Sequence, residues 1–596
     1  MRRSLLLFGM ALFFFIDHIP AQVNGDAVTV DLRLDGSKVY QSIDGFGVNA
    51  NTRSWDSVAL RPALDLLLDS MHATVWRIVV ETVEKWEETN DNNDPFTFNW
   101  EYYNKLYKTP KFRKAFEMMR YLNRRGVTGN LMINFMGPVP QWMGGEVIKP
   151  EYEDEYIEML VSFFHYARYT EHVQFGLISP MNEPDLRKEG PTVGPAQFVV
   201  LLKKLMDRMQ ADGMGDVHYV APDVASMNNG IEKYLPVLMK DTAIMSRIAH
   251  LGLHSYGGYY ANVDSFIRTT AYPDESWWIT EWNSWRDGLD DGKIGVYDYQ
   301  FASECIYKLL KLLQHGISAG ISWEGYDSYY EHHAPSLFSY WGILGYNKDR
   351  NTYFPRKHFY AISQVSRFVL PGSKRIDVSD PGDSLTVVAF HDTIRHKVVL
   401  VGVNARHGAV NLNGTLASLG RVSSFAMYHT SSTDDLHRDG NMSVKGRSFH
   451  GKIPARCIFT LYGDEDVRPE PSGWYAGDIH VHLNCGDGTP VYSEDSLAKM
   501  ARVNDLSVVS LLADMGNGEV KVSTRDLPKV NGKDAVVSRP GSLIHWDTEW
   551  HWDATYTEFG NQALGGHLVL LGLQHARQLW DESAGKVLDW GRKQGA

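Results

Sequence analysis

Two glutamates stand at the ends of short apolar segments, where a buried strand would give way to a loop. Glu183 lies in ISPMNEPD (residues 178–185), and Glu281 lies in WWITEWNSW (residues 277–285). When two carboxylates face one cavity, one of them can protonate the leaving oxygen of a glycosidic bond while the other attacks carbon or activates water. This chemistry requires a fold that brings the two segment ends together.

Eight apolar segments between residues 43 and 328 predict such a fold. They begin near residues 43, 73, 128, 176, 218, 250, 277 and 320, and stretches of helical length and pattern separate most of them. Eight alternating strands and helices indicate an α/β fold, a closed (β/α)₈ TIM barrel. A doubly wound open sheet is the alternative, and the absence of a glycine-rich phosphate-binding motif after any of the segments disfavours it.

Other polar and aromatic residues follow the same segments. The carboxyl ends of barrel strands and the loops after them build the active site of a TIM barrel. We therefore expect substrate-binding residues there: Arg77, Asn134, Trp142, Asn182, His254, Tyr256, Trp285 and Trp323. A nucleophilic carboxylate needs donors or cations to stay ionised, which Arg77 and Tyr256 are placed to provide for Glu281, whereas a general acid needs burial.

The rest of the chain divides into segments that differ in their hydrophobic pattern and composition. Residues 361–463 alternate apolar and polar positions between short turns, which predicts an antiparallel β-sandwich. Residues 23–42 alternate in the same way and are expected to contribute its N-terminal strand, leaving 43–360 for the barrel. Residues 464–473 carry two prolines and predict a linker, and 474–596 form a further unit.

The N-terminus and the overall charge bear on location and partners. Residues 1–22 combine two arginines with an apolar stretch of about a dozen residues, typical of a signal peptide. We expect a secreted or periplasmic protein without stable membrane insertion after cleavage. The net charge of −13 offers no basic field for nucleic acid. Cys305, Cys457 and Cys485 are too few and too scattered for a disulfide framework, so we interpret them as packed thiols.

Five motifs in order resemble glycoside hydrolase family 30 over roughly residues 27–463. They are QSIDGFGVNA (41–50), SPMNEPD (179–185), HSYGG (254–258), WWITEW (277–282) and FYAISQVSRFVLPGSKRI (359–376). The resemblance implies a retaining glycosidase that acts on a β-linked glycan or glycoside without a cofactor, with Glu183 as acid/base and Glu281 as nucleophile. PVPQWM (138–143) departs from the family's pattern, which leaves the substrate open. A carbohydrate-binding barrel without turnover is the alternative.

The C-terminal segment carries a different set of residues. GDIHVH places His480 and His482 two positions apart, so both side chains of a strand would point to one face. With EWH (549–551) and GGHLVLLGL (565–573), this segment resembles the polymerase and histidinol phosphatase (PHP) domain. The resemblance implies a divalent metal bound by His480, His482, Glu549 and His567, and metal-dependent hydrolysis as a competing activity. Met515 follows Asp514 where many members have histidine, and the later strands of such domains are missing before Ala596, so we expect an incomplete domain.

Overall fold

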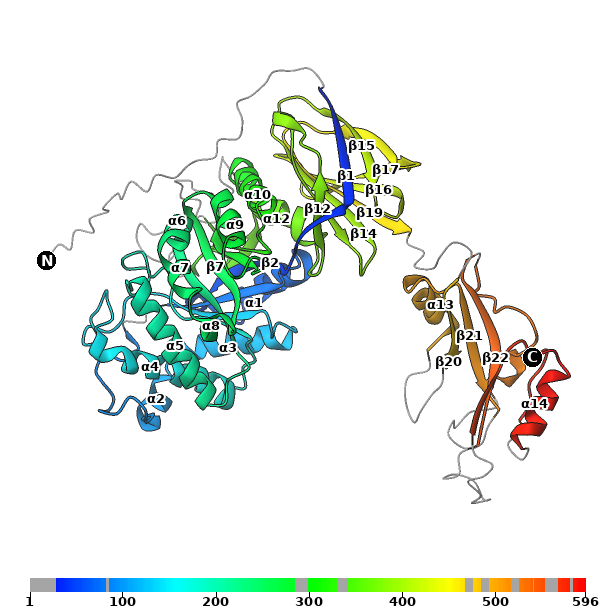
Figure 1. Cartoon of the computed structure of the whole chain (residues 1–596), viewed down its shortest axis with the longest axis horizontal. Coiled ribbons are helices and arrows are strands. Elements are labelled where there is room, and N and C mark those ends of the chain that lie inside the picture. The colour runs from blue at the N-terminus through cyan, green and yellow to red at the C-terminus, as the bar shows by residue number, and fades with distance from the viewer. Residues whose placement is uncertain are drawn as a thin grey trace. The chain divides into compact units, whose positions relative to one another are not determined.

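The computed structural model describes residues 28–81, 85–284, 298–329, 341–466, 475–483, 492–515, 525–539, 541–552, 566–578 and 583–596 (Figure 1). The chain separates into two compact units, Met1–Asp466 and Val467–Ala596. The predicted signal peptide and Cys485 lie outside the described residues.

The first unit contains a closed ring of eight parallel strands. Its strands are β2 (Gly45–Asn51), β3 (Val75–Val80), β4 (Leu131–Phe135), β5 (Leu177–Ser179), β6 (His218–Ser226), β7 (Ile248–Gly257), β8 (Trp277–Trp282) and β9 (Ala319–Ser322). Each strand pairs with the next, and β9 pairs with β2 to close the ring. The eight predicted segments are these strands, so the predicted barrel is confirmed and the open sheet is wrong.

Burial on both faces explains why these strands read as apolar runs. Every residue of β2, β3, β4 and β8 is buried, because helices cover the outside of the ring and side chains fill its interior (Figure 1). The helices of this unit are α1 (Leu60–Asp65), α2 (Trp100–Leu106), α3 (Pro110–Arg124), α4 (Glu153–His165), α5 (Pro195–Ala211), α6 (Met227–Asn229), α7 (Leu235–Leu238), α8 (Thr242–Met245), α9 (Tyr260–Arg268), α10 (Asp298–Gln314) and α12 (Lys357–Ser366).

Helices α3 and α5 begin and end at residues suited to those positions. Both α3 and α5 begin with proline in the first turn. Their chains leave the helix through Gly126 and Gly213, which have φ angles of +88° and +79°. Because glycine adopts this left-handed conformation without steric cost, it ends each helix and lets the chain turn toward the next strand.

A second ring of nine mostly antiparallel strands packs in the same unit. Its members are β1 (Val28–Ser42), β12 (Lys374–Val378), β13 (Thr386–Asp392), β14 (Lys397–Asn404), β15 (Val410–Ala417), β16 (Arg421–Thr430), β17 (His437–Lys445), β18 (Ser448–Ile453) and β19 (Cys457–Asp466). The N-terminal β1 joins it, antiparallel to β12 and parallel to β15. The sheets of the predicted sandwich are therefore linked by hydrogen bonds into one closed ladder.

Two elements cross the boundaries that composition predicts. Helix α12 continues from Lys357 through residue 360 to Ser366. Strand β19 continues to Asp466, because its backbone pairs with β14 and β16 through the charged residues Asp464, Glu465 and Asp466. The first residues of the predicted linker therefore belong to the sheet. A short hairpin, β10 (Leu344–Asn347) with β11 (Thr352–Pro355), follows the barrel.

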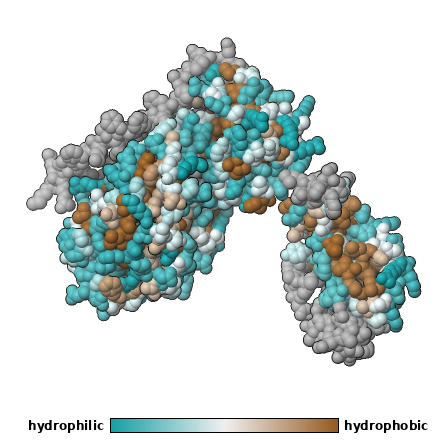
Figure 2. All heavy atoms as spheres, in the orientation of Figure 1, coloured by the Kyte–Doolittle hydropathy of each residue, from teal (hydrophilic) through white to brown (hydrophobic). Residues whose placement is uncertain are grey.

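The second unit has a four-stranded sheet. Strands β20 (Gly477–Val481), β21 (Val508–Asp514) and β22 (Leu543–Trp552) run parallel, and β23 (Gly566–Leu570) is antiparallel to β22. Its helices are α13 (Glu494–Val503) and α14 (Ala584–Arg592). Apolar side chains reach the surface of this unit (Figure 2), among them Ile479, Val503 and Val508, so its small core leaves apolar surface in contact with solvent.

Candidate active site

The barrel brings Glu183 and Glu281 to one place. Glu183 follows β5, the fourth barrel strand, and Glu281 lies near the end of β8, the seventh. One oxygen of each carboxyl group and one ring nitrogen of His254 all lie within 4.8 Å of one another. Both carboxyl groups are buried, at 4% and 3% exposure. The site is thus a close pair of buried acids bridged by an imidazole.

Glu281 is surrounded by donors. Arg77 donates from Nη1 to Oε1 over 2.7 Å, and the Tyr256 hydroxyl donates to Oε2 over 3.1 Å. His254 Nδ1 lies 3.5 Å from Oε2. Burial raises the pKa of Glu281, and the charges of His254 and Arg77 oppose that rise. Two cations and a hydroxyl therefore favour the ionised form that a nucleophile requires.

Glu183 has fewer donors. His254 Nδ1 lies 2.7 Å from its Oε1, and no second cation contacts it among the described residues. Burial raises the pKa of Glu183, and the charges of Glu189 and Asp185 raise it further against the opposing effect of His254. Such a carboxyl group keeps its proton to higher pH than an exposed glutamate, as a general acid must.

Asp223 connects these groups, and the sequence analysis missed it. Its Oδ2 accepts hydrogen bonds from Arg77 (2.8 Å), Asn134 (3.2 Å) and Ser179 (2.5 Å). Its Oδ1 accepts from Thr280 (2.5 Å) and faces His254 Nε2 at 3.3 Å. Burial acts to raise the pKa of Asp223, but Arg77, His254 and these hydrogen bonds outweigh burial and hold the pKa well below its usual range. The sequence feature that could have revealed Asp223 is its position as a lone charged residue within the apolar segment HYVAPDVAS.

The charges of the site nearly balance. Burial acts to lower the pKa of His254, but the carboxylates of Glu281 and Asp223 raise it to about 10, so His254 is a cation at neutral pH. Arg77 and His254 then compensate two carboxylates. Arg77 contacts Glu281 and Asp223 but contacts no oxygen of Glu183, so the surroundings favour the proton on Glu183 over Glu281. The two glutamates therefore differ in their cationic neighbours, with Arg77 beside Glu281 alone.

The predicted asparagines position other side chains. Asn182 Oδ1 accepts from Arg77 Nη2 over 2.6 Å, and its amide reaches the backbone oxygen of Glu189 at 3.4 Å. Asn134 is fully buried and donates to Asp223 and Ser179. Asn49, also missed, accepts from Arg77 Nη1 over 2.7 Å. The side chains of Asn49, Asn182 and Asp223 thus fix the Arg77 guanidinium, which in turn holds Glu281.

The predicted tryptophans are only partly described. Trp142 is half-buried, donates from Nε1 to the backbone oxygen of Glu87 over 2.7 Å, and packs its ring edge-on against Tyr152. Trp323 is half-buried and directly follows β9. Trp285 lies outside the described residues.

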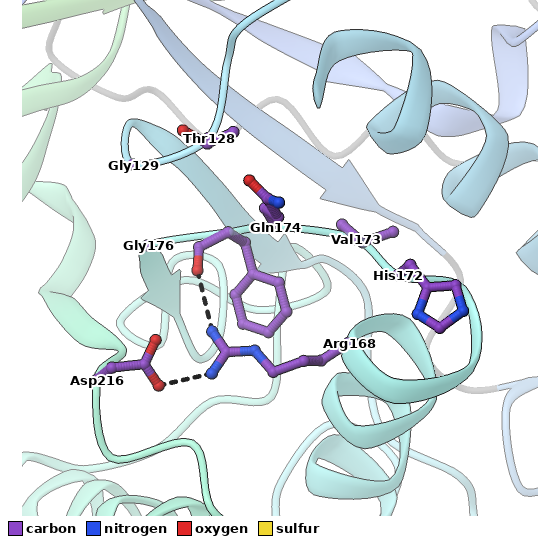
Figure 3. A pocket seen from close by; sticks show the side chains of 9 residues that line it. Thr128, Gly129, Arg168, His172, Val173, Gln174, Gly176 and Asp216 are labelled. Atoms are coloured by element: carbon purple, nitrogen blue, oxygen red, sulfur yellow. Dashed lines mark hydrogen bonds and ion pairs between the residues drawn. The ribbon is translucent and has the colours of Figure 1, made fainter. Parts of the chain in front are cut away.

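A hollow of about 550 Å³ lies at the opposite rim of the barrel, between the segments that precede β4, β5 and β6 (Figure 3). Its Arg168 donates to Asp216 over 2.6 Å and to the backbone oxygen of Phe175 over 3.3 Å. None of the predicted site residues lines this hollow. The chemistry therefore concentrates at the carboxyl rim.

The C-terminal unit gathers three of its four predicted metal ligands. One ligand atom from each of His480, His482 and Glu549 lies within 4.8 Å of the other two. His482 Nε2 is 2.8 Å from Glu549 Oε2, and His567 Nδ1 is 2.8 Å from Glu549 Oε1. His567 therefore contacts the other oxygen of Glu549 and is not a member of the close group. Two imidazoles and a carboxylate are a donor set that fits Zn²⁺ or a similar divalent ion.

The first unit is thus a (β/α)₈ barrel with one acid after its fourth strand, a second acid near the end of its seventh strand, and a β-domain beside it. No family model matches the chain. The chain is 33% identical over 106 residues to the glucuronoxylanase XynC of Bacillus subtilis (strain 168), which is 18% of this chain and 24% of that protein. The match thus spans about a quarter of the length of that curated relative.

Solved structures share the fold over about three quarters of the chain. The glycoside hydrolase family 30 subfamily 8 xylanase Xyn30A from Clostridium acetobutylicum is 19% identical with a TM-score of 0.57, over 73% of this chain and 99% of that one. The endo-β1,6-glucanase BT3312 is 16% identical with a TM-score of 0.54, over 74% and 96% of the two chains. The first unit therefore has the barrel-and-β-domain fold of family 30 structures.

Proposed function

We propose that the chain belongs to glycoside hydrolase family 30 and cleaves a β-linked glycan with retention of configuration. The carrying observation is the approach of the Glu183 and Glu281 oxygens to within 4.8 Å across the carboxyl rim. Retaining enzymes hold their two carboxyl groups about 5 to 5.5 Å apart, whereas inverting enzymes leave about 6.5 to 9.5 Å for a water molecule. The close pair leaves no such room.

The surroundings of the two acids assign their roles. Glu281, held by Arg77 and Tyr256, attacks the anomeric carbon as Glu183 transfers its proton to the leaving oxygen. Esterification removes the charge of Glu281, which lowers the pKa of Glu183 and prepares it to take a proton from water in the second step. The reaction needs no cofactor. Its substrate class follows the xylanases and glucanases that share the fold.

Trapping of the covalent intermediate tests this proposal. A 2-fluoroglycoside with a good leaving group should label Glu281, which peptide mass spectrometry would locate, and the first product released should keep the β configuration by NMR. A carbohydrate-binding barrel without turnover would bind glycans in calorimetry but acquire no label. An inverted product would overturn the double-displacement assignment.

The proposed glycosidase function also suggests where the protein acts and what it binds. The predicted signal peptide supports a secreted or periplasmic enzyme whose partner is its glycan substrate. In the part of the chain that the structure describes, every helix is too short or too polar to traverse a bilayer. Detection of the chain, with its predicted signal peptide removed, in the extracellular or periplasmic fraction would support this location.

Replacing Asp223 by asparagine should move the pH profile of activity. Removing a negative charge lowers the pKa of its cationic and carboxylic neighbours, so His254 and Glu281 should both titrate at lower pH. We expect the acid limb of the kcat/KM curve, which reports ionisation of Glu281, to move to lower pH by roughly one unit. Asp392→Asn is the matched control, because Asp392 is a buried aspartate of β13, remote from the barrel rim. An unmoved profile in D223N would assign Asp223 a purely structural role.

The C-terminal unit favours a second function, binding of a divalent metal. His480, His482 and Glu549 would hold the ion, and a bound ion supplies Lewis-acid activation of water for hydrolysis. The carboxylate of Glu549 also accepts from His567, which orients it toward the histidines. This function is independent of the barrel chemistry.

Metal analysis tests the second function. The H480A/H482A double variant should bind Zn²⁺ at least about tenfold more weakly than the unaltered chain in equilibrium dialysis. His545→Ala is the control, since His545 lies on the same strand as Glu549 but pairs with Asp534. Equal metal content in both variants would contradict the assignment.

A further inference from the structure

A buried acidic cluster lies between the loop after β3 and helix α4, and its residues belong to neither site described above. Asp91 comes from the loop, and Glu155 and Glu158 are three positions apart on α4, so they share a face of the helix. Glu158 is 1% exposed and Glu155 is 8% exposed. Carboxylates are seldom buried to this extent unless they are paired or bind a metal.

These carboxylates have oxygens without a protein donor. Glu158 Oε1, Glu155 Oε2 and Asp91 Oδ1 are all buried and have no hydrogen-bond partner among the described residues. The other Glu155 oxygen accepts only a long bond of 3.4 Å from the Asn90 amide. An unsatisfied buried carboxylate is costly, and three together cost more because their charges repel.

The charges of the cluster act on one another. Burial raises the pKa of Glu158 to about 8, and the charges of Asp91 and Glu155 contribute to the rise. Arg208 opposes it but makes no ion pair with the cluster. Its guanidinium donates to the backbone oxygen of Pro95 over 2.9 Å and lies 4.9 Å from the centre of the Phe98 ring. The described part of the protein thus supplies no cation to neutralise these three acids directly.

We propose that Asp91, Glu155 and Glu158 bind a divalent cation, and that Ca²⁺ fits them best. Every donor is a carboxylate oxygen, which suits a hard cation rather than Zn²⁺ or Cu²⁺. The three carboxylates are not among the groups of ligand atoms that converge within 4.8 Å in the described residues, so their side chains would have to close around the ion. Ca²⁺ accepts six to eight oxygens in an irregular arrangement, whereas Mg²⁺ demands a near-ideal octahedron.

The ion would brace a loop that reaches the barrel rim. The Tyr103 hydroxyl donates to the carboxylate of Glu87 in this loop, and the backbone oxygen of Glu87 accepts from Trp142. Binding would therefore fix Trp142, a predicted substrate-binding residue. This last step rests on the proposed function, whereas cation binding itself does not.

Thermal unfolding of the full chain tests the site. To exclude the C-terminal metal site, the measurements use the H480A/H482A background after treatment with chelator. Saturating Ca²⁺ should raise the melting temperature by roughly 3 °C or more. The same chain carrying Glu155→Gln and Glu158→Gln should show no rise, and Glu151→Gln, an exposed position just before α4, should respond like the parent.

Terbium luminescence gives a second measurement that does not depend on stability. Tb³⁺ bound beside Tyr103 should luminesce on excitation of the aromatic rings, and Ca²⁺ should displace it. If the double variant fails to fold, Asp91→Asn on the loop should weaken displacement by Ca²⁺ at least about tenfold. No Ca²⁺-dependent rise in melting temperature together with no displaceable Tb³⁺ would overturn the proposal, whatever the outcome of the glycosidase tests.

Discussion

Replacement of Glu281 by glutamine should lower kcat/KM by at least about 10⁴-fold on every substrate, because the covalent intermediate can no longer form. Glutamine keeps the shape of the side chain and its contact with the Tyr256 hydroxyl, so the loss should appear in kcat with little change in substrate binding. Steady-state kinetics on aryl β-glycosides would measure the loss, and fluorosugar labelling should disappear with it.

Glu275→Gln provides the matched control for that variant. Glu275 is half-buried in the turn before β8, so it lies at the opposite end of the strand that carries Glu281. Burial raises its pKa to about 7, which makes it a perturbed glutamate without a place in the site. Comparable losses in both variants would indicate that a change to the fold, rather than loss of the nucleophile, explains the effect.

Glu183→Gln should produce a loss that depends on the leaving group. A general acid contributes roughly 10²- to 10⁴-fold when the departing oxygen needs a proton, and little when the leaving group is already a stable anion. Activity on an unactivated glycan should therefore fall by roughly that factor, while glycosylation by a dinitrophenyl glycoside stays within about tenfold of the unaltered enzyme.

A series of aryl glycosides of increasing leaving-group pKa would measure this dependence. The plot of log kcat/KM against leaving-group pKa should be steeper for E183Q than for the unaltered chain. Azide should accelerate the second step in E183Q, since a small anion attacks the intermediate without base catalysis. Equal losses across the series would remove the acid/base role from Glu183.

The fold was predictable from sequence because parallel barrel strands are buried on both faces. Their segments are therefore continuous apolar runs, and the eight runs match the eight strands in order. Glu183 and Glu281 stood out for the same reason, as charges at the ends of such runs. Arg77 and Tyr256 were expected after their strands, but Arg77 lies inside β3 and Tyr256 lies inside β7, and both still contact Glu281.

The other features of the site and fold could not be predicted, because they depend on contacts between distant residues that the periodicity of the sequence does not reveal. Asp223 lies within β6 rather than after it, and its importance comes from five side chains on other strands or positions that converge on it. Asn49 likewise became recognisable only beside Arg77. The extension of β19 through Asp464 to Asp466 is set by its neighbours β14 and β16, because the segment's own composition resembles a linker.

The pairing of β1 with a strand far along the chain determines when its edge can be covered during synthesis. Val28 pairs with Val410, so the partner lies 382 residues later in the chain (410 − 28). At about 5 to 20 residues per second, a ribosome needs roughly 20 to 80 s to make that stretch. The ribosome therefore makes all eight barrel strands before it makes β15, the strand that pairs with this edge of β1. The first described β-strand therefore waits longest for its parallel neighbour, and the backbone groups on that edge stay unpaired until β15 is made.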